Sequence, residues 1–184
     1  LLLLRAIVRD LGYTPLVQGL AVLLLLSSTT FVFHSRRVMA DPLFMLFMLG
    51  FMWAWFRLQI FPNYERVTRL RWAAGAFLGM AVLTKWIFAV LPVLAVCGWH
   101  MGRFLQPRMK DVFVVSGVAF LVAVPWHVMQ SVLHGVDFWK TYAGYHVFER
   151  AGQSLVGESD PSLYLRTIYL ENTILLLGLV LAVF

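Results

Sequence analysis

Residues 15–33 read Pro-Leu-Val-Gln-Gly-Leu-Ala-Val-Leu-Leu-Leu-Leu-Ser-Ser-Thr-Thr-Phe-Val-Phe, and no side chain in this stretch is charged. At the helical rise of about 1.5 Å per residue, such a stretch is roughly 28 Å long, which matches the hydrocarbon thickness of a bilayer. A backbone inside lipid must also satisfy its own hydrogen bonds, as a helix does. The stretch therefore predicts a transmembrane helix.

Further apolar stretches follow along the chain. They cover residues 42–61, 73–99 and 112–133, and another begins at residues 172–184. Arg57 lies near one end of its stretch, where a long side chain can reach the membrane surface, whereas Lys85 interrupts its stretch. Together the stretches predict an all-α fold, a polytopic transmembrane helical bundle with about four to six membrane segments.

The composition excludes an ordinary soluble domain. Hydrophobic residues make up 61% of the 184 residues and charged residues 13%, and the mean hydropathy is +0.80, whereas a soluble domain carries about a quarter charged residues. The aromatic share of 15% excludes a disordered chain, since such chains are poor in aromatics. The single cysteine, Cys97, permits no disulfide within the chain and no cysteine-based metal site.

We expect residues 1–184 to form a single transmembrane domain that is truncated at both ends. Residues 1–4 are all Leu with no initiating Met, which we interpret as the tail of an earlier membrane helix. The apolar residues 175–184 are too few to cross a bilayer, which takes about 20 residues per helix. Part of the functional machinery is therefore expected outside this sequence.

Basic residues set the expected orientation, because they concentrate in cytoplasmic segments. The residues placed inside are Arg5, Arg9, Arg66, Arg69 and Arg71. Residues 34–41 then lie outside. Residues 73–99 form either one long tilted helix with Lys85 near the midplane of the membrane, or a short helical hairpin with Lys85 at its tip. Each arm of the hairpin would be too short to cross the bilayer fully. The hairpin is favoured because it places the short basic segment 100–111 inside; it also places residues 135–171 outside.

Asp41 is the first candidate for a functional site. It lies in the sequence Ser35-Arg36-Arg37-Val38-Met39-Ala40-Asp41-Pro42. Asp before Pro is typical of a helix start, with Asp as the N-cap and Pro at the first helical position. A carboxylate at the membrane surface can also hold an acceptor or a metal ion, while the two neighbouring arginines hold a phosphate. The structural and the functional role are compatible.

Lys85 is the second candidate. It follows Gly75, Gly79 and Thr84 and precedes Trp86. An ionisable side chain within a membrane segment indicates a functional site, and an ammonium at the bilayer edge suits a lipid phosphate. The alternative is a lysine that reaches the membrane surface beside Trp86 without a further role.

Residues 135–152 predict a helix that lies on the membrane surface, with Asp137 as its cap. Its aromatic face consists of Phe138, Trp139, Tyr142, Tyr145 and Phe148. His146 and Arg150 share one side of this helix with Tyr142 and Glu149, which indicates a metal ligand or proton carrier beside an anion clamp. The alternative is an aromatic belt with solvated polar tips.

Other features indicate packing, or are missing. His127, in Pro125-Trp126-His127, predicts an interhelical hydrogen bond or interfacial packing. The sequence contains no Gly-rich phosphate loop, no nucleophile elbow and no HExxH pair. Nothing therefore supports a nucleotide cofactor, a soluble nucleotide sugar or ATP hydrolysis, and we expect no nucleic-acid partner.

Several strings resemble one family. Residues 37–44, Arg-Val-Met-Ala-Asp-Pro-Leu-Phe, resemble the second acidic loop of polytopic glycosyltransferases of the C superfamily. Residues 75–92 resemble their Gly-x₃-Gly-x₄-Thr-Lys segment, and residues 124–126 with Gly135-x₂-Phe138-Trp139 and His146-x₃-Arg150 resemble the helix end and the outer loop beyond it. The chain is most similar to the protein O-mannosyltransferase-like family that includes the lipid A aminoarabinose transferase.

The resemblance implies an integral, multi-pass enzyme of a bacterial or archaeal plasma membrane. It implies transfer of a hexosyl or pentosyl group from a polyprenyl phosphate to a lipid, glycan or protein acceptor, on the outer face and with inversion. The main catalytic carboxylate of the family lies in an outer loop after the first helix, which we expect to precede this sequence. Asp41 matches the second acidic position.

The predicted site residues, from their chemistry and from the resemblance together, fall into two groups. The catalytic group comprises Asp41 and His146, which could also hold a divalent metal ion as a cofactor. The group that binds the lipid phosphate comprises Lys85, Arg37 and Arg150. A function from another class remains open, a transporter or lipid flippase fragment, because an ionisable residue in a glycine-interrupted segment is also typical of transporter sites.

Overall fold

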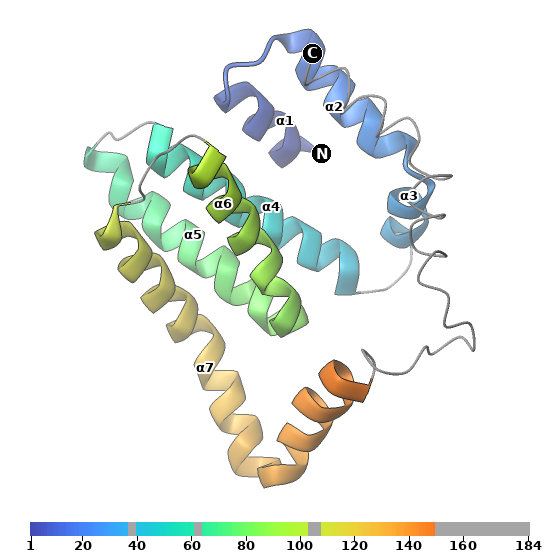
Figure 1. Ribbon diagram of the computed structural model, residues 1–184, viewed down its shortest axis with the longest axis vertical. Coiled ribbons are helices and arrows are strands. Elements are labelled where there is room, and N and C mark those ends of the chain that lie inside the picture. The colour runs from blue at the N-terminus through green and yellow to red at the C-terminus, as the bar shows by residue number, and fades with distance from the viewer. Residues whose placement is uncertain (37–39, 61–63, 103–107, 150–184) are drawn as a thin grey trace.

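The computed structural model describes residues 1–36, 40–60, 64–102 and 108–149, and every element in this part of the chain is helical. The α-helices are α1 (Leu2–Asp10), α2 (Pro15–Ser27), α3 (Thr29–Ser35), α4 (Ala40–Ile60), α5 (Tyr64–Lys85), α6 (Val90–Gly102) and α7 (Met109–Trp139). A 3-10 turn, η1 (Trp86–Ala89), joins α5 to α6, and a π-helix, η2 (Lys140–Glu149), follows α7. The predicted all-α helical bundle is confirmed (Figure 1).

The helix predicted over residues 15–33 is divided into α2 and α3 at Ser28, so the expectation of one continuous helix is wrong. Ser28 has an extended backbone (φ −71°, ψ 112°), and its Oγ accepts a hydrogen bond from the backbone N–H of Phe31 at 3.3 Å. Hydroxyl side chains compete in this way for backbone groups and favour helix starts over helix interiors. The Ser-Ser-Thr-Thr run at residues 27–30 therefore ends α2.

Residues 73–99 form a hairpin, as the favoured alternative predicted. α5 ends at Lys85, and after the turn α6 runs back in the opposite direction and packs against α4 (Figure 1). Pro92 stands in the first turn of α6, where the missing backbone N–H costs nothing, and its side chain is fully buried. The turn is therefore packed against the bundle.

The expectation that both arms are short is wrong for the first arm. α5 begins at Tyr64 and has 22 residues, which makes it about 33 Å long. The basic residues between the apolar stretches 42–61 and 73–99 lie in the first part of this helix. Arg66 and Arg69 are exposed while Val67 and Ala74 are buried, so the segment is amphipathic and lengthens the helix instead of interrupting it.

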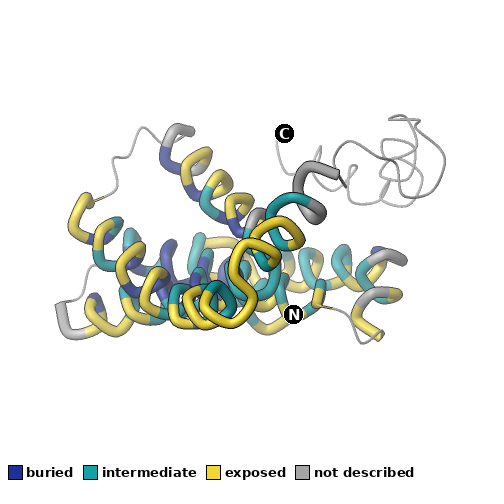
Figure 2. The backbone as a smooth tube through the Cα atoms, turned by 90° about the horizontal axis from the view of Figure 1, so that it is seen from below, coloured by how far each residue is buried: buried dark blue, intermediate teal, exposed yellow. Residues whose placement is uncertain are grey.

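Two described segments are long and apolar enough to cross a membrane, namely Ala40–Ile60 and Met109–Gly144. α2 is apolar but shorter. Buried residues gather in the interior of the bundle and exposed residues lie along its sides (Figure 2). Many of the exposed residues are large and apolar. On α7, for example, Phe113 is 70% exposed and Val132 78% exposed. Exposed apolar sides of this extent are typical of helices that face lipid.

The core is built around the middle of α4. Phe51, Ala54 and Trp55 of this helix are buried against Ala74 of α5 and Val115 of α7. The Trp55 indole N–H donates a hydrogen bond to Nε2 of the buried His100 at 3.0 Å, which connects α6 to the same core. α1, α3, α5 and α6 thus pack against α4, while α7 packs against the other side of α5.

Two glycines form a seam between α5 and α7. A Cβ on Gly75 would lie 2.5 Å from Val118 Cβ and 2.8 Å from the Val115 carbonyl oxygen. A Cβ on Gly79 would lie 2.7 Å from Val122 Cβ. A step of four residues along α5, from Gly75 to Gly79, is matched by a step of four residues along α7, from Val118 to Val122, so the two helices run parallel. Small residues four apart let helix backbones approach closely, which is a recurrent way of packing helices in membranes.

We expect Gly75→Ala to lower the free energy of unfolding by about 1–3 kcal/mol, because the added methyl group has rigid backbone against it. Gly98→Ala is the matched control: a Cβ there meets nothing within 4 Å, and Ala is favoured over Gly in a helix by about 1 kcal/mol. Thermal unfolding of both variants in detergent is the measurement. Equal melting temperatures for the two variants would contradict the seam.

Candidate functional site

Polar residues gather at the two ends of the bundle. α4 runs antiparallel to α5, so the start of α4 lies beside the end of α5 (Figure 1). At this end Asp41 of α4 forms an ion pair with Lys85 of α5. At the opposite end Arg71 of α5 forms an ion pair with Asp111 of α7. These two pairs differ sharply in burial, which decides their roles.

The Asp41–Lys85 pair is half-exposed. The side chains are 40% and 35% exposed, and the Lys85 ammonium also lies 5.6 Å from the centre of the Phe88 ring. Asp41 stands inside the first turn of α4, which begins at Ala40, so the prediction that it is the N-cap is wrong. The first turn still presents unpaired backbone N–H groups, whose partial positive charge stabilises the carboxylate. A ligand can reach both charged groups.

An aromatic cluster adjoins this pair; it consists of Trp86, Trp126, His127, Phe138, Trp139 and Tyr142. Trp86 comes directly after Lys85, and its ring stacks on Tyr142 with centroids 5.3 Å apart and planes at 21°. Tyr142 also stacks on Phe138 at 4.9 Å. The cluster therefore connects the hairpin turn to the helix that follows α7.

His127 fixes the centre of the aromatic cluster. Its Nδ1 lies 2.8 Å from the carbonyl oxygen of Ala123, and its Nε2 lies 3.0 Å from the Tyr142 hydroxyl. Because a carbonyl only accepts, Nδ1 of the neutral ring donates to it and Nε2 accepts from Tyr142. The predicted packing role of His127 is confirmed, and its partner Tyr142 lies on η2.

Gly135 makes this arrangement possible. Its φ of 56° and ψ of −136° lie in a region that only glycine adopts readily, and the chain turns sharply there (Figure 1). The segment after the turn is helical through Glu149, so the predicted helix is present over the described residues. Asp137, predicted as its cap, is exposed and pairs with Lys140 at 3.4 Å. The turn brings Tyr142 back to His127.

The opposite end is closed by buried charge. Asp111 is fully buried, and its Oδ1 accepts hydrogen bonds from two guanidinium nitrogens of Arg71, with the Nε at 2.7 Å. Its Oδ2 accepts from Gln59 Nε2 at 3.3 Å. This network ties the end of α4 to the starts of α5 and α7. Because it is inaccessible, it serves the structure and offers no site for a ligand.

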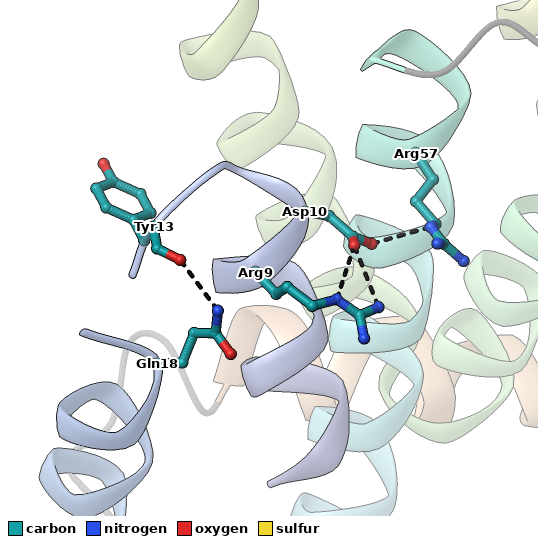
Figure 3. A network of polar contacts seen from close by, with 5 residues as sticks. All are labelled: Arg9, Asp10, Tyr13, Gln18 and Arg57. Carbon is teal, nitrogen blue, oxygen red and sulfur yellow. Dashed lines mark hydrogen bonds and ion pairs between the residues drawn. The ribbon is translucent and has the colours of Figure 1, made fainter. Parts of the chain in front are cut away.

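A second network fastens α1 to α4 at the same end (Figure 3). Asp10 lies between Arg57, whose Nε is 2.9 Å away, and Arg9, at 3.2 Å. Gln18 Nε2 donates to the carbonyl oxygen of Tyr13 at 3.0 Å and closes the turn into α2. Arg57 thus has a carboxylate partner as well as the snorkelling position that the sequence indicated.

A family model described as dolichyl-phosphate-mannose-protein mannosyltransferase matches residues 1–142. The chain belongs to this family. Neither the comparison with curated proteins nor the comparison with solved structures returned a match. The matched residues contain the Asp41–Lys85 pair, the glycine seam and the aromatic cluster up to Tyr142.

Membership makes this mannosyltransferase-family protein a membrane glycosyltransferase of the class that uses a polyprenyl-phosphate sugar. The predicted family is confirmed, and the match favours the enzyme over the transporter or flippase alternative. Of the predicted site residues, Asp41 and Lys85 meet each other. His146 lies on η2, and Arg37 and Arg150 lie outside the described residues.

Sequence reasoning missed two features of this candidate site. It treated Asp41 and Lys85 as separate candidates, although the hairpin and the orientation rule already placed both toward the outer side. It also treated Trp86 only as an interfacial neighbour of Lys85, whereas the ring joins the hairpin turn to Tyr142. No spacing signal reveals the second contact, because it depends on the turn at Gly135.

Proposed function

We propose that this protein transfers a sugar from a polyprenyl-phosphate donor to a hydroxyl of a lipid, glycan or protein acceptor on the outer face of the membrane. The observation that carries the proposal is the half-exposed contact between Asp41 and Lys85 at one end of a bundle with apolar sides. A lipid-linked donor is already activated. The site therefore needs a side chain that binds the acceptor hydroxyl, a cation that binds the phosphate, and an opening through which the lipid-linked donor can enter from the membrane. The contact supports all three.

The chemistry divides between the two side chains. The acceptor oxygen attacks the anomeric carbon, its proton passes to a carboxylate, and the bond from carbon to phosphate oxygen breaks, which releases the polyprenyl phosphate. Lys85 binds the phosphate and stabilises the charge that grows on it. Asp41 holds Lys85 in place before the donor binds and orients the acceptor hydroxyl afterwards. Lys85 thereby exchanges a carboxylate partner for a phosphate.

A divalent metal ion remains a proposed cofactor, with Asp41 and His146 as the residues that would hold it. Such an ion would supply positive charge to the leaving phosphate. Across residues 1–36, 40–60, 64–102 and 108–149, no group of three His, Cys, Asp or Glu side chains is placed to hold one. We propose no nucleotide cofactor, because the sequence has no phosphate-binding glycine loop.

The outer-face location is supported by the distribution of charge. The exposed cations at the end opposite to Asp41 include Arg9, Arg66, Arg69, Arg108 and Lys110. The carboxylate side chains described at that end, Asp10 and Asp111, are buried in ion pairs, and Glu65 near the start of α5 adds a single acidic residue to this basic end. Because basic residues remain in the cytoplasm, Asp41 and Lys85 face outward. A bacterial or archaeal plasma membrane is the proposed location.

A transfer assay with the full-length protein in lipid nanodiscs tests the proposed function. We expect transfer from polyprenyl-phosphate mannose and none from a nucleotide sugar. Asp41→Asn keeps the shape of the side chain but loses its charge, and we expect the rate to fall about 100-fold. Efficient transfer from the nucleotide sugar, or a fully active Asn variant, would contradict the proposal.

A further inference from the structure

Two buried indole N–H groups have no hydrogen-bond acceptor within the described part of the chain, those of Trp53 and Trp86. A buried donor without a partner is costly, and native structures keep very few of them. Such a group therefore requires a reason, and the two tryptophans stand in very different surroundings.

Trp53 lies in the middle of α4, with the Arg57 guanidinium 5.3 Å from its ring centre. It is 12 residues along the helix from Asp41, roughly 18 Å at the rise of a helix. Nothing near Trp53 points to a ligand. Trp86, in contrast, follows Lys85 directly and starts the hairpin turn.

The Trp86 ring is held in place. One face stacks on Tyr142, and the Tyr142 hydroxyl is fixed in turn by His127 at 3.0 Å. A side chain fixed in this way keeps its N–H in one direction whether or not an acceptor is present. A fixed, desolvated donor on the residue that directly follows Lys85 in the sequence is suited to an anionic oxygen, because hydrogen bonds to charged acceptors are the stronger ones.

We propose that the Trp86 N–H donates a hydrogen bond to a phosphate oxygen of the polyprenyl-phosphate donor, beside the Lys85 ammonium. The inference rests on the proposed function, since it assigns a second binding group, a hydrogen-bond donor, to the same phosphate. Lys85 supplies charge, and Trp86 supplies direction, because an indole N–H on a stacked ring has one fixed axis. Trp86 is thus a donor-binding residue in its own right.

The decisive variant is Trp86→Phe, which keeps an aromatic ring against Tyr142 and removes the N–H. Replacement of Trp86 by benzothienylalanine, in which sulfur takes the place of the N–H on the same bicyclic ring, covers the case in which Phe packs poorly. Trp53→Phe is the matched control, because it also removes a buried, unpartnered N–H but lies away from Lys85.

The measurement is the binding of polyprenyl phosphate, without a sugar, to the full-length protein in nanodiscs, together with lipid-free thermal unfolding. We expect both Trp86 replacements to bind the lipid about 10-fold more weakly or worse, with melting temperatures no lower than that of the Trp53→Phe control. Trp53→Phe should bind like the wild type.

Three results would overturn the assignment. Unchanged binding in both Trp86 variants would show that the N–H does not reach the phosphate. A lower lipid-free melting temperature than that of the control would show that the N–H has an acceptor in the protein. Weaker binding of the sugar-bearing donor alone would place the N–H on the sugar. Failure of the wild type to bind polyprenyl phosphate would instead reject the proposed function itself.

Discussion

Lys85→Met is expected to reduce sugar transfer by about 100-fold or more while leaving the fold intact, because removal of one group that stabilises a developing charge has effects of that size. The Asp41–Lys85 pair is more than one-third exposed, and exposed pairs contribute only about 0–1 kcal/mol to stability. Met is similar in length and packs equally well beside lipid. Activity and stability should therefore separate, as measured by donor titration and thermal unfolding of the same preparation.

Two further variants make this prediction specific. Lys140→Met removes the same charge from an exposed lysine that pairs with Asp137 at 3.4 Å, and we expect no effect on transfer. Lys85→Arg should recover only part of the activity, since a planar guanidinium does not replace a compact ammonium in a fitted position. Normal kinetics in Lys85→Met would contradict the phosphate site. Lys85 would then be a lysine that only reaches the membrane surface beside Trp86.

Arg71→Met is expected to lower the free energy of unfolding by about 3–5 kcal/mol, which is the cost of leaving a buried carboxylate without its partner. Asp111 is fully buried and Arg71 is 14% exposed, so little solvent is available to compensate. The measurement is thermal unfolding in detergent. Arg69→Met, which removes an exposed arginine of the same helix, is the matched control and should change stability by at most about 0.5 kcal/mol.

The double variant Arg71→Met with Asp111→Leu separates an ion-pair effect from a packing effect. Replacement of a whole buried pair by apolar residues is often neutral or stabilising, so most of the lost stability should return. A double variant no more stable than Arg71→Met would show that the arginine stabilises α5 through packing alone. That result would contradict the role assigned to Asp111.

The apolar stretches predicted the helices that depend on hydrophobicity alone. Residues 42–61 correspond to α4, and residues 112–133 lie within α7. The boundaries failed where polar residues act locally. Ser28 ends a helix through a side-chain hydrogen bond, and the arginines of residues 66–71 extend α5 because exposed basic residues are compatible with an amphipathic helix. A hydropathy pattern cannot distinguish a basic loop from a basic helix end.

The site was predictable as a set of residue types but not as a set of contacts. An acid beside a helix start and a lysine within an apolar run are each unusual enough to be selected from the sequence. Their ion pair depends on the antiparallel packing of α4 and α5, and the Trp86–Tyr142 stack depends on the backbone turn at Gly135. Both are consequences of tertiary geometry, which no local spacing encodes.

The Arg71–Asp111 network imposes an order on biogenesis. The two residues are 40 positions apart, on helices that run parallel, with α6 between them in the chain. While the polypeptide is being synthesised, the guanidinium of Arg71 has no carboxylate partner until the start of α7 has emerged, and the glycines of α5 have no helix to pack against. The contacts of α5 are therefore completed only after α7 has been made. Docking of α7 finishes the packing of a helix that was synthesised before it.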